Sequence, residues 1–299
     1  MKLRLKLRAA DAPFWILIGL CAAAIVCCAA YIGYHYGYLP KKIEDQNAAY
    51  AALYAPEETS AAPSLSAPAP SPAPTDVPPT SAPEAVIYAA PTLPPARDQF
   101  AALLDINPET VGFLTIEGML ELPVAQRLND NEYYLAHNFE GEKSIAGSLF
   151  LDGVNRLSLG DDCMIVYGHN MKNGTMFGKL ADYALRGVLA KYPIVHFDTL
   201  YEDGAYVPFA CFALDVDADS IALRKFQFDG TQFDDYVADL RARSLYDIPV
   251  DVSPGDDLLL LITCNYNVDD GRFVLALRRL REGEVEADMR ALVAQSEMK

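Results

Sequence analysis

An apolar block near the start of the chain constrains the fold more than any other feature. Residues 14–38 contain no Lys, Arg, Asp or Glu. A helix needs ~20 apolar residues to cross the hydrocarbon core of a bilayer, and this block is long enough. Four of the first eight residues are Lys or Arg, which predicts that residues 1–13 stay in the cytoplasm and that everything after Tyr38 lies outside. We therefore expect a single-pass protein of the cell membrane with an extracellular domain.

A cleaved signal peptide is the alternative interpretation of the same block. Ala29 and Ala30 are small residues of the kind found near cleavage sites. The apolar run, however, is longer than the 7–15 residues usual for the core of a signal peptide. The length favours an uncleaved anchor.

Composition divides the rest of the chain. Residues 39–54 form a juxtamembrane segment, and residues 55–96 are rich in Pro, Ala and Ser, with 12 of the 20 prolines. Proline lacks an amide donor, so this stretch predicts a linker, which would reach on the order of 100 Å at ~3.1 Å per residue if fully extended. A disordered linker of no particular length is equally compatible with it. The net charge of −17 argues against nucleic acid as a partner.

Residues 97–281 predict one folded domain, followed by a charged tail over 282–299. Short strand-like runs dominate, and many strands with few helices predict a mainly β fold: a closed barrel with helical insertions. The predicted strands are Val111–Ile116, Leu122–Gln126, Ser148–Leu151, Cys163–Tyr167, Ile194–Phe197, Val207–Leu214, Leu258–Thr263 and Phe273–Leu277. The predicted helices are a short one around Phe100–Leu104, Met176–Arg186, Phe233–Ser244 with Thr231 as a cap, and a peripheral helix or frayed end in the tail.

Cysteine usage points to a nucleophile. Three of the six cysteines lie in the apolar block, which leaves Cys163, Cys211 and Cys264 outside the membrane. Three is an odd number, so at least one thiol is unpaired unless a bond joins two chains. An unpaired thiol in an exported domain is a candidate nucleophile.

The run that ends at Cys264 has the form of a catalytic platform. Leu258–Thr263 predicts a buried strand that ends at the cysteine, and Asn265–Gly271 has turn character. If Phe273–Leu277 pairs with the first strand, Arg272 returns to face Cys264, where a guanidinium could stabilise an oxyanion. Arg278 and Arg279 are rival arginines, but they lie too far along the strand.

His169 is the candidate partner of the thiol. It follows Gly168 at the end of a predicted strand, a position where catalytic groups are often displayed. The other histidines have structural interpretations: His35 abuts the membrane, His137 is a hydrogen-bonded residue and His196 lies on a strand surface. A Cys–His pair performs acyl transfer, since the thiolate attacks a carbonyl and the imidazolium protonates the departing amine.

Several motifs resemble those of class B sortases, in the same order along Ile106–Leu280. The match is to the histidine, cysteine and arginine segments and to four upstream segments: Tyr167–Leu180, Thr263-Cys264, Gly271–Val274, Ile106–Gly112, Leu122–Gln126, Asp130–Leu135 and Ala146–Asp152. The chain departs from the family pattern at Leu260, where a threonine is usual, and at Phe113, where a tryptophan is common.

The resemblance implies an activity and a set of residues. Sortases cut a C-terminal sorting signal of secreted proteins, hold the product as a thioacyl enzyme and pass it to an amine, usually of a peptidoglycan precursor and sometimes a pilin lysine. His169, Cys264 and Arg272 match the catalytic residues. Substrate binding is implied for Asn131, Leu135 and Thr263. The family implies no metal and no organic cofactor.

Two other classes remain as alternatives. Papain-like peptidases place the cysteine before the histidine, whereas His169 precedes Cys264 here, and the Ser-X-Gly-Cys signature of L,D-transpeptidases is absent around Cys264. The second alternative is a wall-associated β-barrel that only binds. The presence of all three catalytic residue types argues against it.

Overall fold

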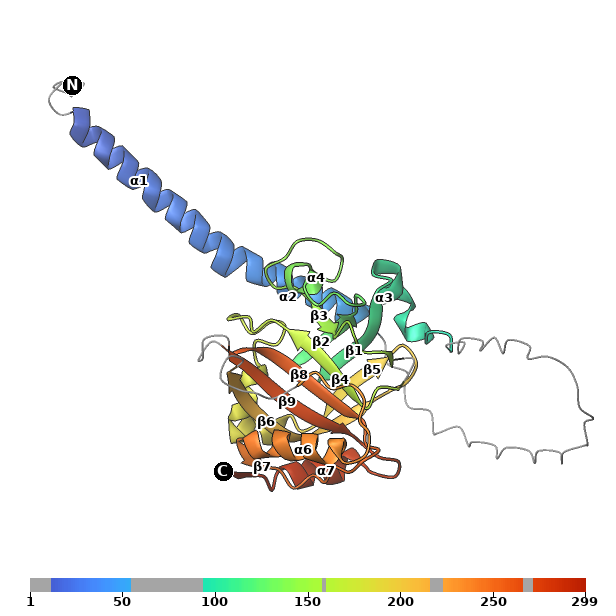
Figure 1. Ribbon diagram of the computed structural model, residues 1–299. Coiled ribbons are helices and arrows are strands. Elements are labelled where there is room, and N and C mark those ends of the chain that lie inside the picture. The colour runs from blue at the N-terminus through green and yellow to red at the C-terminus, as the bar shows by residue number, and fades with distance from the viewer. Residues whose placement is uncertain (1–11, 55–93, 158–159, 216–222, 266–270) are drawn as a thin grey trace, which may run out of the picture.

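Eight strands of the described chain form a closed barrel at the centre of the molecule (Figure 1). The computed structural model describes residues 12–54, 94–157, 160–215, 223–265 and 271–299. The barrel strands are β1 (Thr110–Ile116), β2 (Leu120–Ala125), β3 (Leu149–Leu151), β4 (Cys163–Gly168), β5 (Val195–Thr199), β6 (Ala205–Asp215), β8 (Leu258–Asn265) and β9 (Gly271–Arg279). Their order is β1-β2-β3-β4-β8-β9-β6-β5, and β5 pairs with β1 to close the barrel. The eight predicted strands and the predicted barrel are confirmed.

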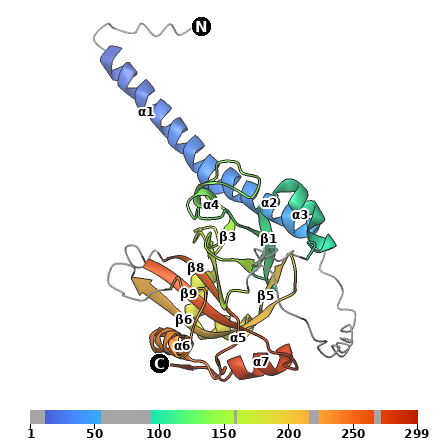
Figure 2. The same ribbon diagram turned by 45° about the vertical axis from the view of Figure 1, so that its right-hand side comes forward.

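Strand direction decides which residues meet at each rim of the barrel. The pairs β2–β3 and β4–β8 are parallel, whereas β8–β9 is antiparallel. The carboxyl ends of β4 and β8 therefore lie at the same rim, and β9 begins there. In Figure 2, β8, β9 and β6 run side by side across the barrel.

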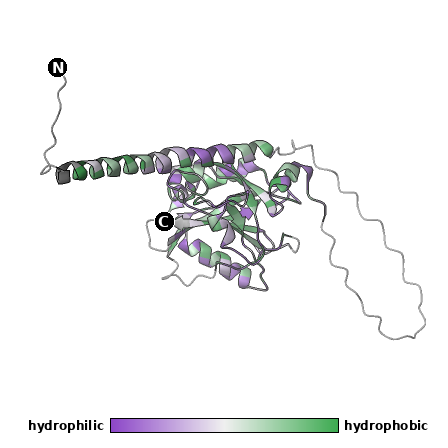
Figure 3. Cartoon of the chain, turned by 90° about the horizontal axis from the view of Figure 1, so that it is seen from above, coloured by the Kyte–Doolittle hydropathy of each residue, from purple (hydrophilic) through white to green (hydrophobic). Residues whose placement is uncertain are grey.

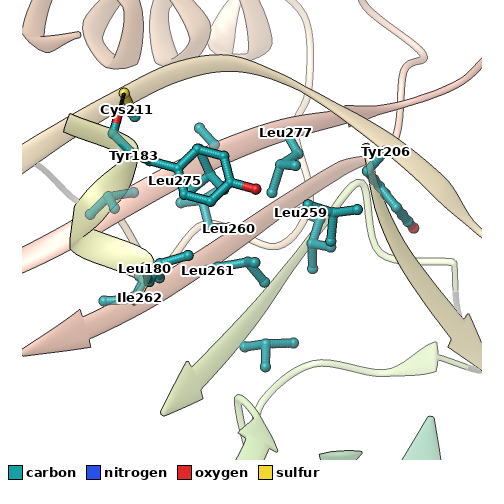
Figure 4. Close-up of a cluster of buried hydrophobic side chains, with 14 of the residues drawn as sticks. Leu180, Tyr183, Tyr206, Cys211, Leu259, Leu260, Leu261, Ile262, Leu275 and Leu277 are labelled. Atoms are coloured by element: carbon teal, nitrogen blue, oxygen red, sulfur yellow. Dashed lines mark hydrogen bonds between the residues drawn. The ribbon is translucent and has the colours of Figure 1, made fainter. Parts of the chain in front are cut away.

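Strand β8 is buried on both faces. Side chains alternate along a strand, so four consecutive leucines, Leu258–Leu261, with no exposed surface require cover on each side. One face of β8 packs into the barrel. The 3₁₀ helix η5 (Leu180–Ala184) contributes Leu180 and Tyr183 to the cluster of buried side chains that includes the β8 leucines (Figure 4). Each fully buried leucine contributes roughly 1.5–3 kcal/mol relative to an exposed one, so the strand is a rigid support for the residues at its end.

The segment after β4 differs from its prediction. A single helix was expected over Met176–Arg186, but the structure has η5 followed by α5 (Arg186–Lys191). Met176 has a φ of 51°, which lies in the left-handed region and cannot belong to a right-handed helix. It also forms an isolated bridge with Asn170. The pairing of Met176 with Asn170 therefore takes the place of the first turn of the predicted helix.

The remaining helices cover the barrel from outside. The amino-terminal pair η3 (Asp98–Phe100) and α3 (Ala101–Ile106) and the helix α6 (Gln232–Arg243) agree with their predictions, and α4 (Tyr133–Ala136) was not predicted. Thr231 is the N-cap residue of α6, as predicted, but its backbone is helical and its side chain makes no capping hydrogen bond. The tail forms α7 (Glu286–Val293) and β10 (Glu297–Met298), which pairs with β7 (Tyr246–Asp247). The tail is thus a docked helix and strand.

A long helical rod leads from the N-terminal side to the barrel (Figure 3). It consists of α1 (Ala12–Ile32), the π-helical η2 (Gly33–Tyr38) and α2 (Leu39–Leu53). The helix Ile16–Leu53 contains a stretch that is apolar and long enough to cross a membrane, and this stretch is not buried in the molecule. One such helix is compatible with the predicted anchor. The π-helical segment η2 ends just before Pro40, whose backbone nitrogen cannot donate a hydrogen bond to the helix.

Helix α2 is part of the folded domain, which the sequence did not predict. Tyr54, the residue after it, stacks on Phe113 of β1 at 4.1 Å between ring centroids, and its hydroxyl donates to Asp198. Gln99 Nε2 in turn donates to the Tyr54 hydroxyl at 2.9 Å. The two flanks of the Pro-rich stretch therefore touch each other.

This contact lies at the two ends of the linker predicted over residues 55–96, which stays a prediction. Residues 55–93 lie outside the described residues, as does most of the predicted turn before Gly271. The chain nevertheless leaves the barrel at Tyr54 and is back beside the same side chain at Gln99. Tyr54 and Gln99 therefore lie side by side on the barrel.

Candidate active site

Strand register brings the three predicted catalytic residues to one rim. Gly168, the last residue of β4, pairs with Thr263 in the parallel ladder with β8. One residue further along each chain stand His169 and Cys264. In the antiparallel ladder with β9, Cys264 pairs with Arg272. Neighbouring strands are ~4.8 Å apart, so the backbones of these residues are adjacent.

The ring of His169 is held from outside the barrel. Its Nε2–H donates to the backbone carbonyl of Leu135 in α4, at 2.7 Å. The loop over the ring comes close at Gly147, whose φ is 59°. A Cβ at Gly147 would lie 2.5 Å from the Tyr134 carbonyl oxygen and 3.1 Å from His169 Cδ2, so any larger residue there would displace the ring or the loop.

A groove of about 300 Å³ opens at this rim. Its lining comes from the loop before α4, from α4 itself and from β3, β4, β8 and β9. The lining residues are Asn131, Glu132, Leu135, Phe150, Tyr167, Gly168, His169, Ile262, Thr263 and Arg272. Asn131, Leu135 and Thr263, which the family resemblance implied for substrate binding, all belong to this set, together with His169 and Arg272.

Two of these residues have hydrogen-bonding features that matter for a ligand. Thr263 is 2% exposed, and its Oγ1 has no hydrogen-bond partner within the described part of the chain. Buried hydroxyls are normally satisfied, so this atom is a candidate to bind a ligand. Asn131, in contrast, is already engaged: its Nδ2 donates to Asp152 and its Oδ1 accepts from Gly153 N–H.

Sequence reasoning gave no role to Phe150, Tyr167 or Ile262, although all three line the groove. Tyr167 had a detectable signal, because it stands two residues before His169 and so shares its side of β4. Phe150 belongs to the Ala146–Asp152 motif, which the resemblance included without assigning a role. Ile262 had no signal, since it is one apolar residue in an apolar run.

The other two thiols of the barrel domain are poor nucleophiles. Cys163 and Cys211 are free and completely buried. Burial raises the pKa of Cys211 to about 12 and that of Cys163 still further. Cys211 Sγ contacts the Tyr183 carbonyl in the core (Figure 4). Neither sulfur lines the groove.

The rival arginines are used elsewhere. Arg278 is fully buried and forms an ion pair with Glu284, and Arg279 pairs with Glu202 and Asp257. Both lie at the opposite end of β9 from Arg272. Among the described residues, no group of three or more His, Cys, Asp or Glu side chains is arranged to hold a metal ion.

Comparison with known proteins assigns the family. No protein-family model matches the chain. Sortase B of Listeria monocytogenes is 34% identical over 183 residues, which cover 60% of this chain and 73% of that protein. A crystal structure of sortase B from B. anthracis has 31% identity and a TM-score of 0.58, with 63% of this chain and 85% of that chain covered. A Staphylococcus aureus sortase B–substrate complex has 28% identity, a TM-score of 0.58 and coverage of 63% and 87%.

The shared barrel, with its groove at the ends of β4 and β8, and the extent of these matches agree with the resemblance seen in the motifs. The chain belongs to the class B sortases. Its activity is accordingly that of a sortase-type transpeptidase.

Proposed function

We propose that Cys264 is the nucleophile of this sortase, His169 its general acid and base, and Arg272 the group that stabilises the oxyanion. The observation that supports these roles is the strand register, in which Gly168 pairs with Thr263 and Cys264 pairs with Arg272. The groove adds support, because His169 and Arg272 line it together.

The reaction proceeds in two acyl transfers. The Cys264 thiolate attacks the carbonyl carbon of the scissile peptide bond, and the electron pair moves to the carbonyl oxygen beside the Arg272 guanidinium. The C–N bond then breaks as the His169 imidazolium gives its proton to the departing amine, leaving a thioacyl enzyme. An acceptor amine attacks the thioester and loses its proton to His169, and the thiolate leaves.

The substrates follow from family membership. We propose that the donor is a secreted protein with a C-terminal sorting signal, and that the acceptor is an amine of a peptidoglycan precursor or a pilin lysine. Asn131, Leu135 and Thr263 would contact the sorting signal. The buried Thr263 hydroxyl supports this role, because a backbone group of a bound peptide would give it the partner that the described residues do not supply.

We also propose the membrane topology and the division of the chain. Residues 1–13 remain in the cytoplasm, residues 14–38 cross the membrane, and the catalytic domain over 97–281 works outside. The apolar helix and the basic residues that precede it support this arrangement. The exposed tyrosines Tyr31, Tyr34, Tyr36 and Tyr38 are of the type enriched at membrane interfaces.

A test of the nucleophile uses the full chain in detergent or liposomes with a panel of fluorogenic sorting-signal peptides. Cys264→Ala should abolish both product and thioacyl enzyme, detected by mass spectrometry. Cys163→Ala and Cys211→Ala are matched controls and should turn over within about twofold of wild type, because these thiols are buried away from the groove.

The same assay separates the alternatives. Equal loss of turnover in all three cysteine variants would indicate a structural role for the thiols and would refute the assignment of Cys264. Binding of a peptide by the wild type without any turnover would indicate the binding module instead.

A further inference from the structure

A buried carboxylate behind the groove accepts five hydrogen bonds. Asp152 follows β3, and its side chain has no exposed surface. Its Oδ2 accepts from Asn131 Nδ2 at 3.1 Å, from the Tyr167 hydroxyl at 3.1 Å and from Arg224 Nε at 2.8 Å. Its Oδ1 accepts from Arg224 Nη2 at 2.9 Å and from Val154 N–H at 2.9 Å. All its donors but Val154 are side chains from other parts of the chain.

Arg224 is the only one of these donors that carries a charge. Burial alone would raise the pKa of Asp152, but the two-pronged contact with Arg224 and the other hydrogen bonds hold it below its ordinary value. The Asp152 carboxylate is therefore ionised at neutral pH. Arg224 stands 72 residues further along the chain, in the segment before α6, and its side chain is 53% exposed. The charge that holds the buried carboxylate thus comes from the surface.

Two of the neutral donors are groove residues. Asn131 and Tyr167 line the groove together with His169 and Arg272, whereas Asp152 does not. The amide of Asn131 can adopt only one orientation, since Nδ2 must face Asp152 and Oδ1 must face Gly153 N–H. The Tyr167 ring stacks on Phe150 at 5.3 Å between centroids while its hydroxyl donates to Asp152.

We propose that Asp152 and Arg224 are positioning residues, which orient Asn131 and Tyr167 and so shape the wall against which the donor peptide binds. The proposal rests on the proposed function, because it takes the groove as the peptide site. Neither residue is catalytic. Their effect on the substrate passes through the two groove side chains that they hold.

The physical reason is the cost of an unpaired charge. Without the Arg224 guanidinium, the buried Asp152 carboxylate must take up a proton or admit water. A carboxylic acid is itself a donor and accepts fewer hydrogen bonds than a carboxylate. The amide of Asn131 and the ring of Tyr167 would then sample several orientations, and peptide binding would have to restrict them again at an entropic cost.

Arg224→Gln tests the proposal, because Arg224 is half exposed and its replacement removes no side chain from the core. We expect KM for the donor peptide to rise about tenfold and kcat to stay within twofold, since one charged hydrogen-bonded pair that organises binding is lost. Arg224→Lys should give an intermediate KM, because it restores the charge but not the two-pronged contact. Arg290→Gln on α7 is the matched control, an arginine paired with Glu286 and 40% exposed, and should leave KM unchanged.

A second background tests the route of the effect. In Tyr167→Phe protein the phenol donor is already absent, so adding Arg224→Gln should raise KM by clearly less than tenfold. An equal rise in both backgrounds would show that Tyr167 is not on the route, and a KM in Arg224→Gln equal to that of Arg290→Gln would overturn the proposal. Failure of the proposed function is distinct from either result, because it would appear as no turnover in wild type and control alike.

Discussion

The two rims of the barrel are formed by opposite ends of the same strands, and their arginines have different surroundings. At the groove rim, β8 ends and β9 begins, and Arg272 lies beside a cavity with His169. At the far rim, β8 begins and β9 ends, and arginines are matched with carboxylates: Arg278 with Glu284, Arg279 with Glu202, and Arg281 with Asp256. A guanidinium in a two-pronged ion pair stabilises the fold, whereas one at a cavity can meet a substrate.

The comparison teaches that residue type and strand do not determine the role of an arginine. Arg272 and Arg278 point to the same side of β9 by their spacing. Arg278 has no exposed surface and also donates to the Asp251 carbonyl, whereas Arg272 is half-buried and donates to the Gly271 carbonyl. Arg278 is thus built into the fold at the far rim, whereas Arg272 is among the residues that line the groove.

The largest effect should come from Arg272→Lys. An ammonium lacks the planar fork of donors, so we expect kcat to fall by roughly 10²–10³-fold, as for the loss of an oxyanion donor. The melting temperature should stay within a degree or two of wild type. Steady-state kinetics with a sorting-signal peptide and calorimetry on the same sample would measure both. A variant with near-normal kcat would remove Arg272 from the mechanism.

Arg278→Gln should have the opposite effect, a loss of stability with little change in kcat. This change removes a fully buried guanidinium and leaves Glu284, which is 20% exposed, with only Arg281 at 4.0 Å, and breaking such a largely buried pair costs about 3 kcal/mol of stability. The kcat of the folded fraction should remain within twofold of wild type, because Arg278 is at the far rim. Urea unfolding together with kinetics at low temperature would test this. Loss of turnover without loss of stability would erase the distinction between the rims.

The smallest effect should appear in the dependence of the protein's stability on acid pH. The ion pair with Arg281 lowers the pKa of Asp251, and although burial opposes it, the pKa of Asp256 is lowered too. A lowered folded-state pKa contributes stability above the unfolded value of about 3.8, and this stability is lost as the pH falls through the lower folded value.

Arg281→Gln should therefore lower stability at pH 7 by at most about 1 kcal/mol, because the pair is partly exposed and screened. The difference from wild type should vanish at acid pH, where both proteins have protonated carboxylates. Melting temperatures from pH 2 to pH 7 would reveal whether the two curves converge. Parallel curves would show that Arg281 does not act through these carboxylates.

Much of the barrel was predictable because buried strands have apolar runs in the local sequence. The run Leu258–Ile262 is apolar throughout, as a strand covered on both faces must be, and the β4 run has the same character. The failures lie where long-range contacts override local preference. Met176–Arg186 has helical periodicity, but the bridge between Asn170 and Met176 forces a left-handed residue into it.

The site was predictable only in part, for the same reason. His169, Cys264 and Arg272 stand next to strand ends, and strand ends can be recognised along the chain. Asp152 and Arg224 could not be connected, because a salt bridge across 72 residues exists only once the barrel is closed. The bond between Tyr54 and Gln99 is of the same kind, because it joins residues on either side of the Pro-rich stretch.

The sequence by itself determined the apolar helix, the strand-rich domain and the residue types available for acyl transfer, because hydrophobic periodicity and strand ends are local properties. The tertiary structure decided the order and direction of the strands, and with them which histidine, cysteine and arginine share a rim. It also decided which carboxylates form ion pairs with which arginines. These depend on contacts between residues that are distant in the chain, whose free energy is realised only when the whole barrel forms.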